Sequence, residues 1–142
     1  KIGFCFSGEY RNRIVIPSFA ENGDCSYFIA RSYNGDSYKY KNPRASKDVV
    51  FNELFIDWNK DLTIVEGVFD ALVAGNAVPI LGSTLRKGSK LLQQIVRNDT
   101  PIYVALDPDA AAMSKQVFQE RKNNATFIDS DNYLLLDLLS AV

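Results

Sequence analysis

The residues best suited to chemistry in this sequence are acidic, and they follow short apolar runs. The apolar, β-branched run 62–65 stops at Glu66 and Gly67, and Asp70 lies four residues after Glu66. A strand that ends on an acid and a glycine is a common setting for a site in an α/β protein. A helix that begins near Gly67 would place Asp70 one turn in, on the side of the strand end. Glu66 and Asp70 are therefore candidates for one site.

A second pair of acids follows the apolar run 102–106, where Asp107 and Asp109 flank Pro108. Hard divalent cations such as Mg²⁺ prefer oxygen ligands, and proteins usually hold them with one or two carboxylates together with substrate phosphates. If the two runs are parallel strands of one sheet, the acids that follow them reach the same edge. The spacing predicts a metal site at that edge.

An alternation of strands and helices would position these acids. The expected elements after strand 62–65 are helix 68–74, strand 77–81, a helix with apolar positions 91, 92, 95 and 96, strand 102–106, helix 110–122, strand 125–128 and helix 133–139. Such alternation predicts a parallel sheet flanked by helices. Pro79 lacks an N–H, which confines its strand to an edge or Pro79 itself to a strand start. Asp129 and Asp131 would reach the same edge as Glu66, or would cap the last helix.

The first third of the chain has a different pattern. The runs 13–17 and 26–31 read as antiparallel strands, with hairpin-turn residues at 21–24. Residues 38–41 alternate tyrosine and lysine, which on a strand would put both lysines on one face. Those lysines would address phosphates, or would form the solvated face of an ordinary edge strand.

Charge divides along the same line. Residues 1–47 hold eight basic and four acidic side chains, a net charge of +4, which leaves −5 for the remainder of a chain whose total is −1. A basic part beside an acidic part suits an enzyme that grips a polyanion and holds metal. Small charge imbalances are also common in proteins without such a role.

Composition excludes several classes of protein. With 142 residues, of which 46% are hydrophobic, the chain can form one well-cored unit with a small appended lobe. No apolar run approaches the roughly 20 residues that span a bilayer. Two isolated cysteines and no histidine indicate neither a zinc site nor a disulfide framework, so a reducing cytosol is the default. Because the sequence begins at Lys1 without a signal-peptide pattern, we expect a piece of a longer protein.

A strand ending in Glu66-Gly67, followed by a later strand ending in Asp107-x-Asp109, resembles the Toprim domain shared by topoisomerases, bacterial-type primases, some nucleases and recombination proteins. The stretches before it resemble the catalytic core of bacterial-type primases, of the kind also carried by phages. These stretches are 10–17, 28–31, 38–43 and Lys47 ahead of Val50 and Phe51. The resemblance to the primase core spans nearly the entire chain.

The resemblance implies an α/β fold with two parts. A basic, mainly antiparallel β subdomain with its connector would occupy residues 1–58. A Toprim-type parallel sheet flanked by helices would occupy residues 59–142. The implied activity is that of a DNA primase, which synthesises RNA primers on a single-stranded DNA template from ribonucleoside triphosphates with Mg²⁺ or Mn²⁺.

The resemblance also implies roles for individual residues. Glu66, Asp107 and Asp109 would be catalytic acids and metal ligands, with Asp70 and Asp131 as further metal ligands or supporting acids. The implied contacts to template or nucleotide phosphates are Arg13, Arg31, Lys39, Asn42 and Lys47. Guanidinium and ammonium groups suit such contacts.

Further expectations concern the setting of the chain. A replicative helicase would bind through regions outside this sequence, and the protein would act at the replication fork in the cytoplasm, or in a host's cytoplasm if phage-encoded, without contacting a membrane. Pro108 stands where primases usually have glycine, and the flanking zinc-binding and helicase-contacting modules are missing. The isolated chain is therefore expected to be a poor primase. A different hypothesis is a non-catalytic or nucleolytic Toprim module that binds nucleic acid in a replication or recombination complex.

Overall fold

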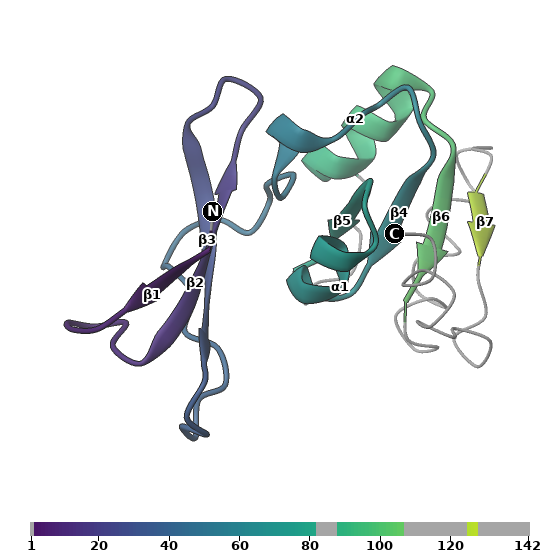
Figure 1. Ribbon diagram of the computed structural model, residues 1–142. Coiled ribbons are helices and arrows are strands. Elements are labelled where there is room, and N and C mark those ends of the chain that lie inside the picture. The colour runs from purple at the N-terminus through teal and green to yellow at the C-terminus, as the bar shows by residue number, and fades with distance from the viewer. Residues whose placement is uncertain (1, 82–87, 107–124, 128–142) are drawn as a thin grey trace. The chain divides into compact units, whose positions relative to one another are not determined.

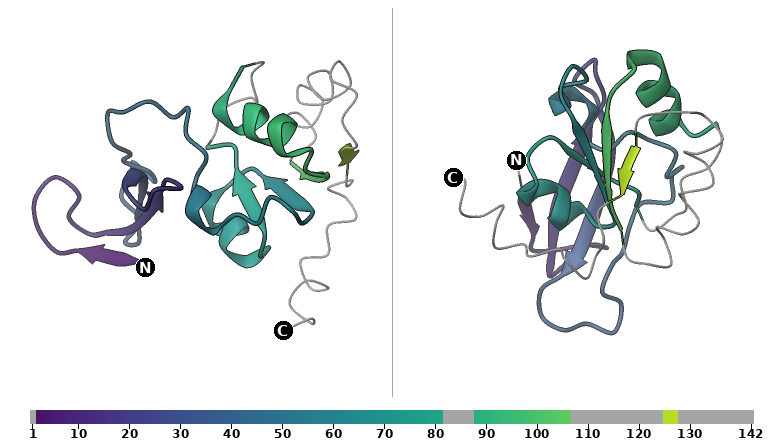
Figure 2. Two further views of the ribbon diagram at one scale, coloured as in Figure 1. Left: turned by 90° about the horizontal axis from the view of Figure 1, so that it is seen from above. Right: turned by 90° about the vertical axis from the view of Figure 1, so that its right-hand side faces the viewer.

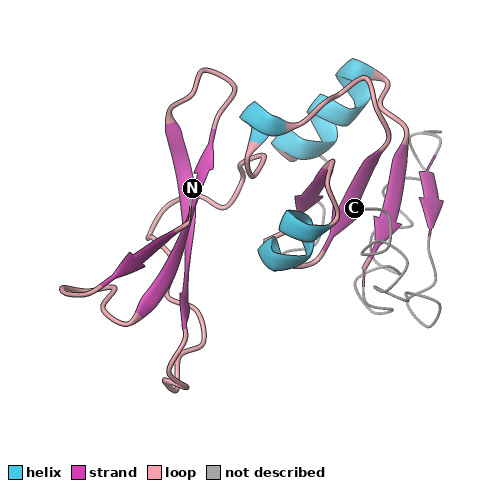
Figure 3. Cartoon of the chain, in the orientation of Figure 1, coloured by secondary structure: helices cyan, strands magenta, loops and turns pink. Residues whose placement is uncertain are grey.

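The computed structural model of this chain describes residues 2–81, 88–106 and 125–127. The chain divides into two compact units, Lys1–Leu54 and Phe55–Val142. This division falls four residues before the predicted boundary after residue 58. Strands and loops make up the first unit as far as the short 3-10 helix η1, Glu53–Phe55, whereas strands alternate with helices in the second (Figure 3).

The first unit is an antiparallel sheet of three strands in the order β1-β2-β3 (Figure 1). The strands are β1 (Gly3–Cys5), β2 (Arg13–Phe19) and β3 (Cys25–Ser32). This arrangement confirms the predicted antiparallel pair and adds β1. The predicted strand 38–41 is reduced to one antiparallel bridge, in which Tyr40 pairs with Arg31 at the free edge of β3.

Alternation along β2 and β3 gives this sheet its core. Ile16 pairs with Ile29, and Ser18 pairs with Tyr27, so these four side chains share one face and all are buried. The Ser18 hydroxyl bonds to the Ser26 hydroxyl at 3.0 Å and accepts a hydrogen bond from the Asn52 N–H at 2.9 Å. The connector is thereby attached to the sheet through a polar group that is itself satisfied.

The second unit contains a parallel sheet of four strands in the order β5-β4-β6-β7 (Figure 1). Its elements along the chain are β4 (Leu62–Val65), α1 (Val68–Val73), β5 (Ala77–Pro79), α2 (Lys90–Asn98), β6 (Ile102–Ala105) and β7 (Ala125–Phe127). Helices α1 and α2 lie on opposite faces of the sheet (Figure 2). The predicted α/β class and helix-flanked parallel sheet are confirmed.

Burial of one face explains the apolar alternation of β4 and β6. Leu62, Ile64 and Val104 are completely buried, Ile102 is 1% exposed, and the register places all four on that face. On the other face Val65 is buried, whereas Tyr103 is 36% exposed. Pro79 lies in β5, which is the edge strand of the described sheet, as its missing N–H predicts.

Helix α2 buries three of the four expected apolar positions and leaves Val96 41% exposed. Leu91, Leu92 and Ile95 are buried, and the Ser89 hydroxyl caps the helix by accepting a hydrogen bond from the Leu92 N–H at 3.3 Å. The predicted helices 110–122 and 133–139 lie outside the described residues. No helix in the described part of the chain is long and apolar enough to cross a membrane.

Candidate functional site

The carboxyl edge of the parallel sheet is where the candidate catalytic acids were predicted. Val65, the last residue of β4, is in register with Pro79 of β5 and with Ala105 of β6. The chain therefore leaves β4 and β6 at one level, with Glu66 following β4 and Leu106 following β6. Glu66 is exposed, whereas Val65 and Leu106 are buried. A carboxylate thus stands at the solvent-reached end of a central, buried strand.

Gly67 allows the chain to turn directly from this strand into α1. Its N–H donates a hydrogen bond to the carboxylate of Asp70, with 3.2 Å between the Gly67 nitrogen and Asp70 Oδ2. A Cβ atom at residue 67 would lie only 2.7 Å from that same oxygen. Glycine is therefore needed because the Asp70 side chain folds back over the start of the helix.

This contact gives Asp70 a structural role that the sequence analysis did not assign. One carboxylate oxygen of Asp70 binds a backbone N–H at the helix start, where a negative charge is also favoured by the helix dipole. Its carboxylate is exposed. Asp70 lies one turn beyond Glu66, as predicted, and its role as a metal ligand stays a prediction.

The remaining predicted acids, Asp107, Asp109 and Asp131, lie outside the described residues. Within the part of the chain that the structure describes, no three acidic, cysteine or histidine side chains come together as a metal site. The donors present at the carboxyl edge fit a hard cation in kind, because Glu66 and Asp70 offer carboxylate oxygens. Two acids alone do not complete such a site, and the acids after β6 would have to join them.

Arg13, one of the predicted phosphate contacts, is largely buried. Its side chain is only 4% exposed and forms an ion pair with Asp36, with 2.9 Å between Nη2 and Oδ2. Its Nη1 nitrogen donates to the Tyr38 carbonyl oxygen at 2.9 Å. Because these bonds hold the loop after β3 against the sheet, Arg13 has a structural role, and its contact with phosphate stays a prediction.

Other predicted contacts divide between structural and exposed positions. The side-chain oxygen of Asn42 accepts a hydrogen bond of 3.5 Å from the Ala30 N–H of β3, which fixes the segment after Tyr40 to the sheet. Arg31 is half-buried, and its guanidinium carbon lies 5.7 Å from the centroid of the Tyr40 ring. Lys39 and Lys47 are exposed. These two lysines are the predicted contacts that remain open to a polyanion.

Lys41, two residues after Lys39 in the sequence, lies in a different environment. Its ammonium group donates to the Glu9 carbonyl oxygen at 3.1 Å and pairs with the Glu9 carboxylate at 3.4 Å. It also lies 5.7 Å from the centroid of the Tyr10 ring. The two lysines therefore are not equivalent, since Lys41 is engaged by a neighbouring turn.

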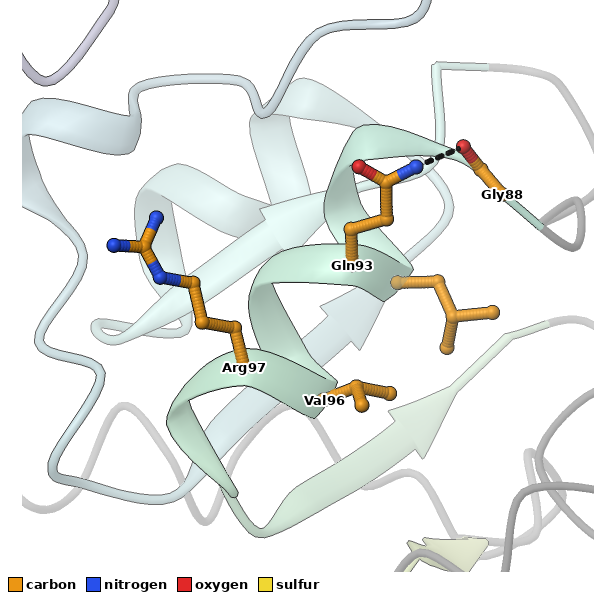
Figure 4. A pocket seen from close by; sticks show the side chains of 5 residues that line it. Gly88, Gln93, Val96 and Arg97 are labelled. Carbon is orange, nitrogen blue, oxygen red and sulfur yellow. Dashed lines mark hydrogen bonds between the residues drawn. The ribbon is translucent and has the colours of Figure 1, made fainter.

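A pocket of about 200 Å³ lies along α2 (Figure 4). Its lining residues are Gly88, Leu92, Gln93, Val96 and Arg97. The Gln93 side-chain nitrogen donates to the Gly88 carbonyl oxygen at 2.8 Å across one end (Figure 4). Since no carboxylate lines it, the pocket is not the predicted metal site.

The sequence analysis did not identify a group of exposed aromatic side chains on the first unit. Phe4 and Phe6 flank Cys5, and their ring centroids lie 4.6 Å apart. Tyr33 contacts Phe4 with 4.9 Å between centroids. The signal in the sequence was the alternation of two phenylalanines near the start of the chain, which indicates a strand with one apolar face.

No protein-family model matches the sequence, and no curated protein matches it significantly. Solved structures of primase domains do match the fold. A DNA primase domain from Pseudomonas aeruginosa gives a TM-score of 0.69 at 20% identity, covering 94% of this chain and 50% of that one. The DnaG primase catalytic domain bound to ssDNA gives a TM-score of 0.69 at 18% identity, covering 99% and 56%.

The primase fragment of the bacteriophage T7 primase-helicase protein also matches, with a TM-score of 0.66 at 13% identity, covering 89% of this chain and 59% of that one. The chain thus spans about half the length of the solved primase chains that it matches. Both the antiparallel sheet and the helix-flanked parallel sheet fall within the matched part, because coverage of this chain is nearly complete. The chain therefore has the fold of a DNA primase catalytic core.

Proposed function

We propose that this chain is the catalytic core of a DNA primase, which synthesises RNA primers on single-stranded DNA from ribonucleoside triphosphates. The observation that carries the proposal is the exposed Glu66 at the carboxyl end of the central strand β4, in a chain with the primase-core fold. In parallel α/β sheets, ligands bind outside the carboxyl ends of the strands. An acid at this position can hold the divalent cation that assists nucleotidyl transfer.

The proposal assigns Glu66, Asp107 and Asp109 to a Mg²⁺ or Mn²⁺ site, with Asp70 and Asp131 as supporting acids. These residues would hold the divalent ion, which would supply activation of the attacking 3′-oxygen and neutralisation of charge on the leaving pyrophosphate. The chain's own contribution is to hold these carboxylates at one edge of a buried sheet. The bond from the Gly67 N–H to Asp70 fixes one carboxylate oxygen beside the strand end, next to the exposed Glu66.

Nucleic acid would bind through the first unit. One matching primase domain is bound to ssDNA in its solved structure, and the first unit of this chain presents Lys39 and Lys47 to solvent. Arg31, beside the Tyr40 ring, would add a third cation. Ribonucleoside triphosphates would bind the metal through their phosphates, because Mg²⁺ held by a few carboxylates usually completes its coordination with substrate phosphate oxygens.

Glu66→Gln in the full-length protein tests the catalytic part of the proposal. Removing one preorganised polar group that stabilises charge in the transition state typically lowers kcat by about 10²–10³-fold. We expect primer synthesis to fall by that amount and stabilisation by Mn²⁺ in thermal melting to shrink. Asp61→Asn is the matched control, because Asp61 is an exposed acid at the opposite end of the same strand, directly before Leu62.

Three outcomes would contradict this assignment. A fully active Glu66→Gln enzyme would remove Glu66 from the mechanism. If the parent shows neither Mn²⁺ stabilisation nor primer synthesis but still binds single-stranded DNA, the chain is a non-catalytic nucleic-acid-binding module. Metal-dependent DNA cleavage without primer synthesis would identify a nucleolytic module.

A salt series tests the proposed contacts to phosphates. Lys39→Ala and Lys47→Ala should each weaken binding of a labelled single-stranded oligonucleotide. Each should also reduce the slope of log K against log salt by about 0.7, the counterion release expected for one phosphate contact on a single strand. Lys60→Ala is the control, since Lys60 is exposed in the second unit and pairs with Asp57. Slopes equal to the parent's for both lysine variants would show that these lysines form only a solvated surface.

A further inference from the structure

The face of the antiparallel sheet that buries Ile16 and Ile29 also carries, in the row of Ile14 and Arg31, exposed aromatic side chains that the proposed phosphate contacts do not use. We call this the aromatic surface and define it by Phe4, Phe6, Tyr33 and Tyr40. Their exposed fractions are 38%, 80%, 56% and 42%. Large rings are normally buried in a small domain because burying a ring is favourable, so a group of four exposed rings calls for an explanation.

The register of the sheet places these rings on one face. Phe4 of β1 is opposite Ile14 of β2, Ile14 is opposite Arg31 of β3, and Arg31 is opposite Tyr40. Directly opposite residues of antiparallel strands point to the same side. The row across the sheet therefore consists of Phe4, Ile14, Arg31 and Tyr40. Tyr33 is two residues beyond Arg31 and joins the row by its contact with Phe4.

Contacts between neighbours hold the rings without burying them. Phe4 meets Phe6 at an interplanar angle of 62° and Tyr33 at 65°, both edge-on arrangements. Aromatic pairs of this kind are favourable beyond the area that they bury. The aromatic surface is thus already ordered before any ligand arrives, which lowers the entropic cost of binding.

Positive charge accompanies the rings. The guanidinium carbon of Arg31 lies 5.7 Å, and the ammonium nitrogen of Lys39 lies 5.8 Å, from the centroid of the Tyr40 ring. A surface that alternates rings with cations matches a single strand of nucleic acid, which offers unpaired bases and phosphates side by side. The core of a protein interface is instead depleted in lysine.

We propose that the aromatic surface stacks the bases of single-stranded nucleic acid. Arg31 and Lys39 then lie near the phosphates of the same strand, and Phe6 and Tyr33 supply the most exposed rings. The inference rests on the proposed function and adds base contacts to it. Because a ring stacks on any base, the surface binds strands of many sequences.

Leucine substitutions in this chain test the stacking. Phe6→Leu and Tyr33→Leu keep apolar bulk but remove the ring, and Phe6→Tyr and Tyr33→Phe retain it. Binding is measured by anisotropy with two labelled single-stranded DNAs of one length, an oligothymidylate and its abasic counterpart. Each leucine variant should bind the oligothymidylate at least about fivefold more weakly, the lower end for base stacking on an aromatic side chain.

The pattern across variants and probes decides the result. Support requires that the ring-retaining variants bind like the parent, that binding of the abasic strand is unchanged, and that the salt slope stays the same. Phe55→Leu, which alters a 67% exposed ring in the second unit, is the matched control and should have no effect.

Two results would overturn the inference. Leucine variants that bind the oligothymidylate as the parent does would show that the rings contact no base, and the proposed phosphate contacts would still stand if Lys39→Ala reduces the salt slope. Equal weakening on both probes would point to altered phosphate contacts. Primer synthesis by Glu66→Gln tests the catalytic site and does not depend on base stacking. Failure of one proposal can therefore be told from failure of the other.

Discussion

The two sheets of this protein carry their charged groups in different places. In the parallel sheet β5-β4-β6-β7, Glu66 stands beyond the end of a strand whose residues other than Thr63 are buried and apolar. In the antiparallel sheet β1-β2-β3, Arg13 and Arg31 lie within strands. A group beyond a strand end can change without disturbing the core, whereas a group on a strand also takes part in packing. Substitutions should therefore separate activity from stability in the second unit and couple them in the first.

Arg13→Met should have the largest effect on stability. The substitution fills the buried space but removes the ion pair with Asp36 and the bond to the Tyr38 carbonyl oxygen. We expect the free energy of unfolding to fall by about 2–3 kcal/mol, since hydrogen bonds to charged groups contribute more than neutral ones. Urea denaturation measures this loss, with the exposed neighbour Arg11→Ala as a control that should stay within about 0.5 kcal/mol.

The proposed difference between the sheets would be wrong if Arg13→Met had the same free energy of unfolding as the parent. If the same variant also showed a reduced salt slope for single-stranded DNA, Arg13 would be a phosphate contact after all. Its burial would then have to be relieved when nucleic acid binds.

A smaller effect is expected at the strand end itself. In Gly67→Ala the new Cβ would lie 2.7 Å from Asp70 Oδ2, so the carboxylate must move away and give up its bond to the residue 67 N–H. The expected loss of stability is about 1 kcal/mol, that of a helix cap. The backbone at Gly67 has a φ of −109°, which alanine also adopts, so the cost comes from the side-chain conflict.

A double-mutant cycle isolates that conflict. In an Asp70→Ala background, Gly67→Ala should cost less, with a coupling of at least about 0.5 kcal/mol between the two positions. Chemical denaturation of the four proteins gives the coupling. Additive losses of stability in the two single variants would mean that the Asp70 carboxylate does not conflict with a side chain at residue 67.

The smallest effect concerns Asp57, near the start of the second unit. The hydrogen bond from Lys60 is the main cause that lowers the pKa of Asp57, and the Asn59 N–H adds to it. A lowered pKa means that this carboxylate stabilises the folded state above its ordinary pKa of 3.8, and that the contribution is lost as pH falls through the lower folded value.

Lys60→Ala should raise the pKa of Asp57 toward its ordinary value, which an NMR titration of the side chain would detect. Because the pair is exposed, stability near neutral pH should barely change. An unchanged Asp57 titration would leave the Asn59 N–H as the dominant cause.

The sequence predicted those features that depend on local pattern. A β-branched run closed by Glu66-Gly67 predicted a strand end with an exposed acid, because the residues that form the strand are adjacent. The role of Arg13 could not be predicted in this way. Its partner Asp36 is 23 residues away, and only the turn after β3 brings them together. The same holds for Tyr40, which pairs with Arg31 through one bridge instead of a strand. The roles of Asp107, Asp109 and Asp131 stay predictions.

Pro79 has a further consequence for how the protein behaves at high concentration. The Asn76 carbonyl oxygen accepts a hydrogen bond from the Thr63 N–H, and the Ile80 N–H donates to the Val65 carbonyl oxygen. The backbone groups of alternate residues of β5 therefore point toward β4, and the Pro79 nitrogen points to the free edge. There the missing N–H breaks no bond within the sheet, yet it removes a donor that a strand from a second molecule would need. The described edge of the parallel sheet is thereby protected against edge-to-edge aggregation.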